Sequence, residues 1–384
     1  MQNEAENLKP AAQGDGISFL KAAPLLGLPA AHVAFEAVSQ KLAGQALYSL
    51  VDPLMALANF GPTIFMFCMG CGVAGSRTTP KRLARQGIQL ILIQILLNIV
   101  RLVIPSLVLM AAGIRLRENI AEYFLLSDIY YFAGLFFLFL ALMRRFRVST
   151  LNMLLICLGL ITVNRLAEPF LAERFSGSLF GVFLGSFIYV DEDSLFPAAC
   201  WMIYPVVGML IGEILKHREA DWRKQFMRRM LVCSAVFSVA LAVSVRGRGQ
   251  NPAELLLPVS SSGAADLLNV MMVICAVLIL ASLADLLCGH IAGSRFYSLV
   301  IRFSASIMPY FLLQWVFVEW EMTILLLCGM PEGGFGLGWY LASTAVITLG
   351  SAVLAIRYGK RIMKPVLKIT APWNWRFLRP KGRR

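Results

Sequence analysis

Long runs of apolar residues are the feature that most restricts the fold of this chain. A helix needs about 20 mainly apolar residues to cross the hydrocarbon core of a bilayer. Ten stretches reach or approach that length, namely residues 17–38, 54–75, 86–111, 127–143, 149–166, 196–215, 227–245, 268–289, 303–328 and 335–357. The sequence therefore predicts an all-α polytopic membrane helix bundle of about ten transmembrane helices.

Composition excludes two soluble domains, which the length of 384 residues would otherwise allow. Hydrophobic residues make up 58% of the chain and charged residues 15%. In soluble domains, apolar residues average about 45–50% and charged residues roughly 25%. One further apolar stretch, residues 177–190, contains glycine and precedes three acidic residues, so we expect it to be re-entrant or interfacial. The first 16 residues are polar, so no cleaved signal peptide is expected.

The charges separate into two sets when both termini are placed in the cytoplasm. The inner segments then hold 27 of the 35 Lys and Arg residues and 7 of the 22 acidic residues, which gives +20 inside and −7 outside. This asymmetry obeys the positive-inside rule and predicts a bacterial-type cytoplasmic (inner) membrane protein. We expect an N-terminal cytoplasmic tail (1–16), a membrane domain (17–357) and a basic cytoplasmic tail (358–384). The basic tail suits an anionic lipid surface, so the bilayer rather than nucleic acid is its expected partner.

Ionisable residues in the first predicted span are costly in a bilayer and indicate function. His32 is the only histidine in an apolar run, and Glu36 follows it on the same helical face. Lys21 precedes His32 by eleven residues, which is close to three turns or about 16 Å. Pro24 and Pro29 lie between them and predict a kink. A neutral imidazole can take a proton from a hydroxyl or amine while a carboxylate orients it; a contact between helices is the alternative for His32.

Further polar residues lie in or beside other predicted spans. Asn98 and Arg101 are one turn apart in the third span, and Gln314 lies in the ninth. A buried Arg101 needs a partner or a watery cavity, and Asp128, at the start of the fourth span, can supply that partner. Structural ion pairing and substrate contact are both open for Arg101 and Asp128. Gln314 is expected to line an outer cavity.

The loop between the second and third predicted spans carries four positive charges, including Arg82 and Arg85. Its role is either to fix the topology or to hold phosphates of a cytosolic donor. Cys68 and Cys71 have a spacing seen in metal and redox sites, but they lie in an apolar helix without a second pair. We therefore expect small residues at a helix contact, and no metal site.

Several segments resemble integral-membrane acyltransferases. The first span is similar to that of the acyltransferase-three family, with a basic residue, ten intervening residues and a histidine; here Lys21 stands where that family usually has arginine. Other segments resemble the heparan-alpha-glucosaminide N-acetyltransferase-like group, although its usual Arg-Gly is here Lys21-Ala22. These segments are FGPTIFMFCMG at 60–70, SDIYYFAG at 127–134 and FPxxxWxxYPxxG at 196–208.

The resemblance implies an enzyme of ten or eleven helices that transfers an acyl group, most commonly acetyl, from cytosolic acyl-CoA to an acceptor on the outer face. The acceptor would be a hydroxyl or amine of a glycan or glycolipid. Lys21, Arg82 and Arg85 would then meet the CoA phosphates. His32 would be the general base, held by Glu36 or a neighbour, with direct attack and an acyl-histidine both open. The resemblance assigns the acceptor site to Asn98, Arg101, Asp128 and Gln314.

Two other functional classes fit the same topology. A secondary transporter of a small or anionic solute would also have proline- and glycine-broken helices with charges near the midplane. A receptor or scaffold without chemistry would tolerate the loss of His32. The sequence leaves the acyl group, the acceptor and the oligomeric state open.

Overall fold

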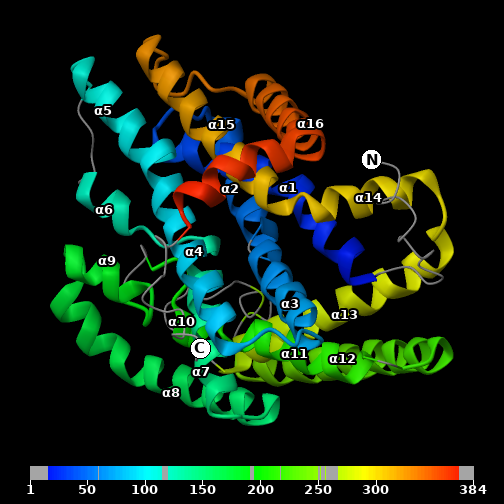
Figure 1. The fold of residues 1–384 in the computed structure, drawn as a ribbon. Coiled ribbons are helices and arrows are strands. Elements are labelled where there is room, and N and C mark those ends of the chain that lie inside the picture. Colours follow the sequence, from blue (N-terminus) through cyan, green and yellow to red (C-terminus); the bar gives the residue numbers. More distant parts are fainter. Residues whose placement is uncertain are drawn as a thin grey trace, which may run out of the picture.

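The computed structural model describes residues 16–58, 60–114, 120–190, 194–216, 218–249, 251, 256 and 267–371. Within these residues, eight helical stretches are long and apolar enough to cross a membrane. Figure 1 shows the helices side by side in one bundle. The predicted all-α polytopic membrane helix bundle is therefore confirmed. The eight stretches are α1 (Gly16–Ser39), the run Pro80–Ala111, α8 (Thr150–Phe175), the run Ala198–Leu215, α12 (Ala220–Gly247), α13 (Leu267–Ile291), α15 (Ile307–Leu327) and α16 (Leu337–Ile369).

Two predicted spans correspond to shorter helices, α3 (Phe60–Ala74) with 15 residues and α7 (Ile129–Arg145) with 17. The predicted boundary at residue 54 is wrong, because a separate helix α2 (Gln45–Ala58) ends before α3 begins. Pro62 lies in the first turn of α3, where its missing N–H breaks no helical bond. The predicted span 54–75 therefore starts too early.

The stretch predicted as re-entrant or interfacial forms the short helix α9 (Leu179–Gly185). Its seven residues measure only about 10 Å along the axis. This length cannot cross a bilayer, in agreement with the prediction. At the other end of the chain, α16 continues to Ile369, so the first part of the predicted C-terminal tail is helical.

Loops that the charge pattern places on the same side of the membrane lie together. The Arg144 guanidinium, at the end of α7, donates hydrogen bonds of 3.0–3.1 Å to three carbonyls at the end of α3 and in the loop that follows it, within residues 73–78. On the predicted opposite side, segments 42–44 and 333–335 pair through backbone hydrogen bonds. The predicted inner loops therefore meet one another, and so do two predicted outer loops.

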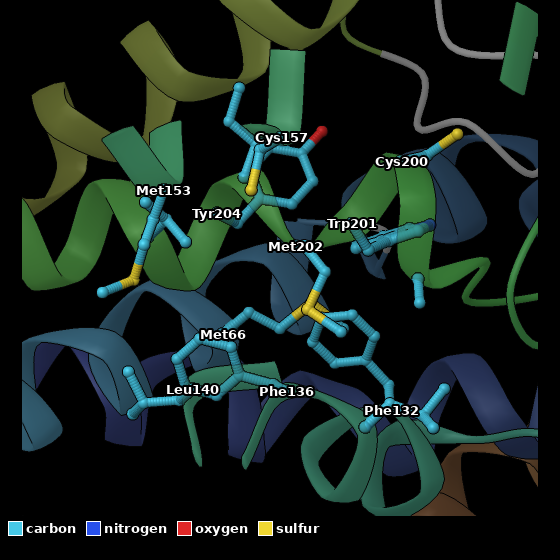
Figure 2. Packing of buried hydrophobic residues seen from close by; sticks show 14 of the residues in the cluster. Met66, Phe132, Phe136, Leu140, Met153, Cys157, Cys200, Trp201, Met202 and Tyr204 are labelled. Carbon is cyan, nitrogen blue, oxygen red and sulfur yellow. The ribbon is translucent and has the colours of Figure 1, made fainter. Parts of the chain in front are cut away.

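One large apolar core joins α3, α7, α8 and α11 (Ile203–Leu215). Figure 2 shows Phe132 and Phe136 of α7 packed with Met66 of α3 and with Met202 and Tyr204 near the start of α11. A second cluster joins α1 with α15 and α14 (Arg295–Ala305). The polar residues predicted as a site border this second cluster.

Glycines bring α3 and α11 into backbone contact. A Cβ added at Gly208 would overlap the Phe67 carbonyl, and one at Gly70 would overlap the Pro205 carbonyl. Small residues at such interfaces let membrane helices approach closely and pack by van der Waals contact. This contact positions the second half of the chain against the first.

Substituting Gly208 by alanine is expected to lower the stability of the folded protein. The new methyl group meets a backbone atom that cannot move aside, and overpacking of this kind costs about 1–3 kcal/mol. Thermal unfolding in detergent measures the effect. Gly159→Ala is the matched control, because a Cβ there meets nothing within 4 Å. Equal melting temperatures for the two variants would contradict the close contact.

A hydrogen bond from another helix compensates for one proline of α1. Pro29 has no N–H, so the Leu25 carbonyl loses its helical partner. The Tyr310 hydroxyl of α15 donates a bond of 2.7 Å to that carbonyl. This bond attaches α15 to α1 about two turns before His32, and so fixes the two helices that carry the site.

Candidate functional site

His32 lies half-buried on α1 and faces α15. Its Nδ1 atom is 3.0 Å from Oε1 of Gln314. Since an amide oxygen only accepts hydrogen bonds, Nδ1 carries the proton and Nε2 of a neutral ring keeps a free lone pair. Gln314 therefore selects the tautomer in which Nε2 can act as a base.

Trp315 stacks on the imidazole of His32. The ring centroids are 3.7 Å apart with an interplanar angle of 20°. The Arg101 guanidinium carbon lies 4.2 Å from the centroid of the same indole, which is a cation–π contact. Phe311 approaches His32 edge-on with centroids 6.5 Å apart. Aromatic contacts thus hold the imidazole and join it to Arg101.

Arg101 is buried and paired with Asp128. The distance from Arg101 Nη1 to Asp128 Oδ2 is 3.1 Å, and the side chains are 2% and 7% exposed. The other Asp128 oxygen accepts a 2.7 Å bond from the backbone N–H of Ile129 and caps α7. The predicted partnership between Arg101 and Asp128 is present in the structure.

Arg101 lies in a π-helical turn, Ile99–Val103, between α4 (Pro80–Asn98) and α5 (Ile104–Ala111). Here the N–H of Ile104 bonds to the Ile99 carbonyl, and the next residue, Pro105, has no N–H. The Val100 carbonyl, which lacks an α-helical partner, accepts a 3.1 Å bond from the indole of Trp320. Such wide turns are frequent at functional sites.

Asn98 serves a structural role in the described residues. Its Oδ1 accepts a 2.8 Å bond from Gln94, and its Nδ2 donates a 2.9 Å bond to the Leu126 carbonyl. These bonds fix the chain just before Asp128. A contact of Asn98 with substrate stays a prediction, and both atoms of its amide group already have protein partners.

Glu36 does not hold His32 in this structure. The Nδ1 position that a carboxylate would occupy belongs to Gln314. A Glu36 oxygen instead accepts a 3.2 Å bond from the Ser39 hydroxyl. One turn of α1 separates the two residues, but the imidazole is turned toward α15. The neighbour that orients His32 is therefore the predicted site residue Gln314.

An open cavity of about 400 Å³ lies at the predicted cytoplasmic side. Three cationic side chains line it, Lys21 of α1, Lys216 beside α11 and Arg223 of α12. Glycines of α3 and α11, including Gly72 and Gly212, form part of its wall. His32 is not among its lining residues. The cavity and His32 are therefore two separate places along α1.

Arg82 and Arg85 lie apart from this cavity. Both belong to the first two turns of α4 and not to a loop, and neither lines the cavity. Arg82 is exposed and Arg85 is half-buried. Helix α4 packs along α7, whereas the cavity that Lys21 lines is formed by residues of α1, α3, α11 and α12 and by Gly75 and Lys216 beside them. The structure thus does not bring the three predicted phosphate-binding residues together.

Several groups at both places were not predicted from the sequence. Trp315 was not a candidate because aromatic residues are common in membrane spans. Lys216 and Arg223 counted only as topological charges, and Arg223 is ion-paired with Asp285. Asp285 is an ionisable residue in an apolar run, which is the signal that would have found this pair.

The CxxC pair lies in the wall of the cavity. Cys68 is buried, Cys71 is half-buried, and both are in the thiol form rather than in a disulfide. The Cys68 sulfur lies 3.7 Å from the Ile17 carbonyl of α1. This position at a contact between α3 and α1 agrees with the predicted helix contact, and it also makes Cys71 a reporter of cavity occupancy.

A comparison of the chain with protein-family models, with curated proteins and with solved structures found no match.

Proposed function

We propose that this protein is a membrane acyltransferase that takes an acyl group from cytosolic acyl-CoA, with acetyl-CoA as the expected donor. The acceptor is a hydroxyl or amine of a sugar or glycolipid on the outer side of a bacterial-type cytoplasmic membrane. In this proposal the chain crosses the membrane ten times with both ends in the cytoplasm, so that the donor binds on the inner side and the acceptor on the outer side. The observation that carries the proposal is that α1 presents Lys21 to an open cationic cavity and His32 to a buried polar site.

The cavity provides the donor side. Lys21 and Lys216 face it and form no ion pair with another residue of the described ranges, while Arg223 is partly neutralised by Asp285. Two or three cations around an open space suit the phosphate groups of a nucleotide donor. Lys216 also lies 3.5 Å from the Gly75 carbonyl, which holds its ammonium group at the cavity wall.

His32 provides the base. Nε2 takes the proton of the acceptor hydroxyl or amine while that oxygen or nitrogen attacks the thioester carbonyl carbon. The carbon–sulfur bond then breaks, and the CoA sulfur leaves with the proton that His32 returns. The products are an ester or amide and CoA with a free thiol. Gln314 and Trp315 keep the imidazole in the required tautomer and orientation.

The donor's thioester must reach His32 from the cavity. Lys21 and His32 are eleven residues apart on α1, or about 16 Å along the axis. Leu25 and Leu28 lie buried between them at 0% and 6% exposure. An extended pantetheine arm would follow α1 and displace these two side chains. The proposed route therefore runs along the proline-containing part of the helix.

Transfer assays with Lys21 variants test the proposal. Purified protein in proteoliposomes is given labelled acetyl-CoA and a glycan acceptor, and label in the glycan is measured. Lys21→Gln is expected to raise the KM for acetyl-CoA by about tenfold or more, because a hydrogen bond to a charged group is worth about 1.5–3 kcal/mol. Lys360→Gln, an exposed position on α16, is the matched control and is expected to leave the KM unchanged.

Alkylation of Cys71 gives an independent measurement of the same site. Acetyl-CoA is expected to slow the labelling of Cys71 and to leave exposed Cys328 unaffected. Absence of both protection and transfer by the wild-type protein would refute the donor site. Counterflow of a labelled anionic solute would then favour the transporter, and the buried Arg101–Asp128 pair is the feature that suits that second function.

A further inference from the structure

Three buried side chains around His32 carry N–H groups that have no acceptor among the described residues. They are Nε2 of Gln314, Nε1 of Trp315 and Nε of Arg101. These residues are only 0%, 9% and 2% exposed. A buried donor without a partner costs about 1–3 kcal/mol, and such groups are rare enough that each needs an explanation. Three of them beside one histidine indicate a missing acceptor.

The contacts place these donors together. Gln314 already bonds His32 through Oε1 at 3.0 Å, so its NH₂ group lies on the same amide. Trp315 is stacked on His32 at 3.7 Å. Arg101 lies over the indole of Trp315 at 4.2 Å. The unpaired N–H groups therefore belong to side chains that contact His32 directly or, for Arg101, through the indole of Trp315.

The charge of the site limits what this acceptor can be. Arg101 is already paired with Asp128 at 3.1 Å, and the other donors belong to neutral groups. A full anion such as a phosphate is better served by the open cationic cavity at the other end of α1. Two neutral N–H donors and a cation that already has a counter-ion suit a carbonyl oxygen, because such an oxygen acquires negative charge only during the reaction.

We infer that the N–H groups of Gln314, Trp315 and Arg101 bind the acyl carbonyl oxygen of the donor, an inference that rests on the proposed function. When the acceptor attacks the carbonyl carbon, the C=O electron pair moves onto this oxygen, and the N–H groups stabilise the charge. The electron pair returns to re-form C=O as the CoA sulfur leaves. Trp315 thereby has two functions, because its ring holds His32 and its N–H contacts the reacting carbonyl.

Trp315→Phe separates these two functions. Phenylalanine keeps an aromatic ring beside His32 and Arg101 but removes the Nε1–H. We expect kcat for acyl transfer to fall by about 10²–10³-fold, as for the loss of one oxyanion-binding donor, with the KM for acetyl-CoA unchanged. The matched control is Trp339→Phe, at a position that is 55% exposed on α16, and its kcat should equal that of the wild type. Thermal unfolding of each variant confirms that it is folded.

A second variant keeps the test decisive if Trp315→Phe does not fold. Gln314→Glu retains an oxygen for the His32 Nδ1–H and removes the donor, so the same fall in kcat is expected. Wild-type kcat in either folded variant overturns the carbonyl site and leaves the acyltransferase proposal standing. A wild-type protein that transfers no acyl group overturns both proposals.

Discussion

Replacing His32 by alanine is expected to abolish acyl transfer while the protein still inserts and folds. General acid–base catalysis contributes about 10²–10⁴-fold to a reaction rate, and the variant loses the whole of that contribution. Binding of acetyl-CoA, measured by protection of Cys71 from alkylation, should persist, because His32 does not line the cavity. The measurement is labelled acetyl transfer to glycan by equal amounts of wild-type and variant protein.

Two further variants make this result specific. His290→Ala removes an exposed histidine at the end of α13 and should leave transfer unchanged. Glu36→Gln distinguishes the two proposed ways of orienting His32. Since the structure pairs Nδ1 with Gln314, Glu36→Gln should retain activity. A fully active His32→Ala variant would contradict catalysis at this site, and an inactive Glu36→Gln would return the orienting role to the carboxylate.

Neutralising Asp128 is expected to destabilise the whole site. Asp128→Asn keeps an N-cap for α7 but leaves Arg101 as a buried cation without a counter-ion. Removing one partner of a buried ion pair costs about 3–5 kcal/mol. Arg101 is 2% exposed and lies over Trp315, so the stacking on His32 should loosen as well. Unfolding in detergent micelles measures the change in free energy.

The double variant Arg101→Gln/Asp128→Asn tests whether the cost comes from the unpaired charge. Two neutral side chains at these positions should be more stable than either single variant, because no buried ion is left alone. Arg101→Gln alone leaves the Asp128 carboxylate buried and should also be destabilised. Equal stability of all three variants and the wild type would show that the pair contributes nothing.

Much of the architecture follows from the apolar runs and the charge asymmetry. Mean hydropathy is high, at +0.72, and the apolar runs that give this value correspond to helices. The break between α2 and α3 could not be predicted from the apolar runs, because residues 54–58 are as apolar as the residues of α3. Likewise, the π turn near Arg101 depends on an indole from α15 that is more than 200 residues away in sequence.

Most residues of the site could be predicted from the sequence, but which side chains contact one another could be predicted less well. His32, Gln314, Arg101 and Asp128 were identifiable because polar groups in membrane spans are costly, and the structure brings them together. Spacing along one helix suggested Glu36 as the partner of His32. Spacing reports only neighbours on the same helix, whereas the rotation of α1 toward α15 is set by packing between helices.

The cationic cavity was the hardest feature to predict. It is formed where α1, α3, α11 and α12 meet, and no single segment carries its pattern. Lys21, Lys216 and Arg223 each look like an ordinary positive charge at a helix end. Their common position depends on the close approach of α3 and α11 at glycines, which a single sequence does not specify.

The π turn also changes the phase of a membrane-length helix. One extra residue in a turn rotates everything beyond it by about 100° relative to an uninterrupted α-helix. The run Pro80–Ala111 can therefore present an apolar stripe to α7 along α4 and a different stripe to α15 along α5. A one-residue deletion within Ile99–Val103 would leave a regular helix of nearly the same length, with α5 facing the wrong neighbour. Point substitutions cannot reproduce that shift, so insertions and deletions are the changes to which this segment is most sensitive.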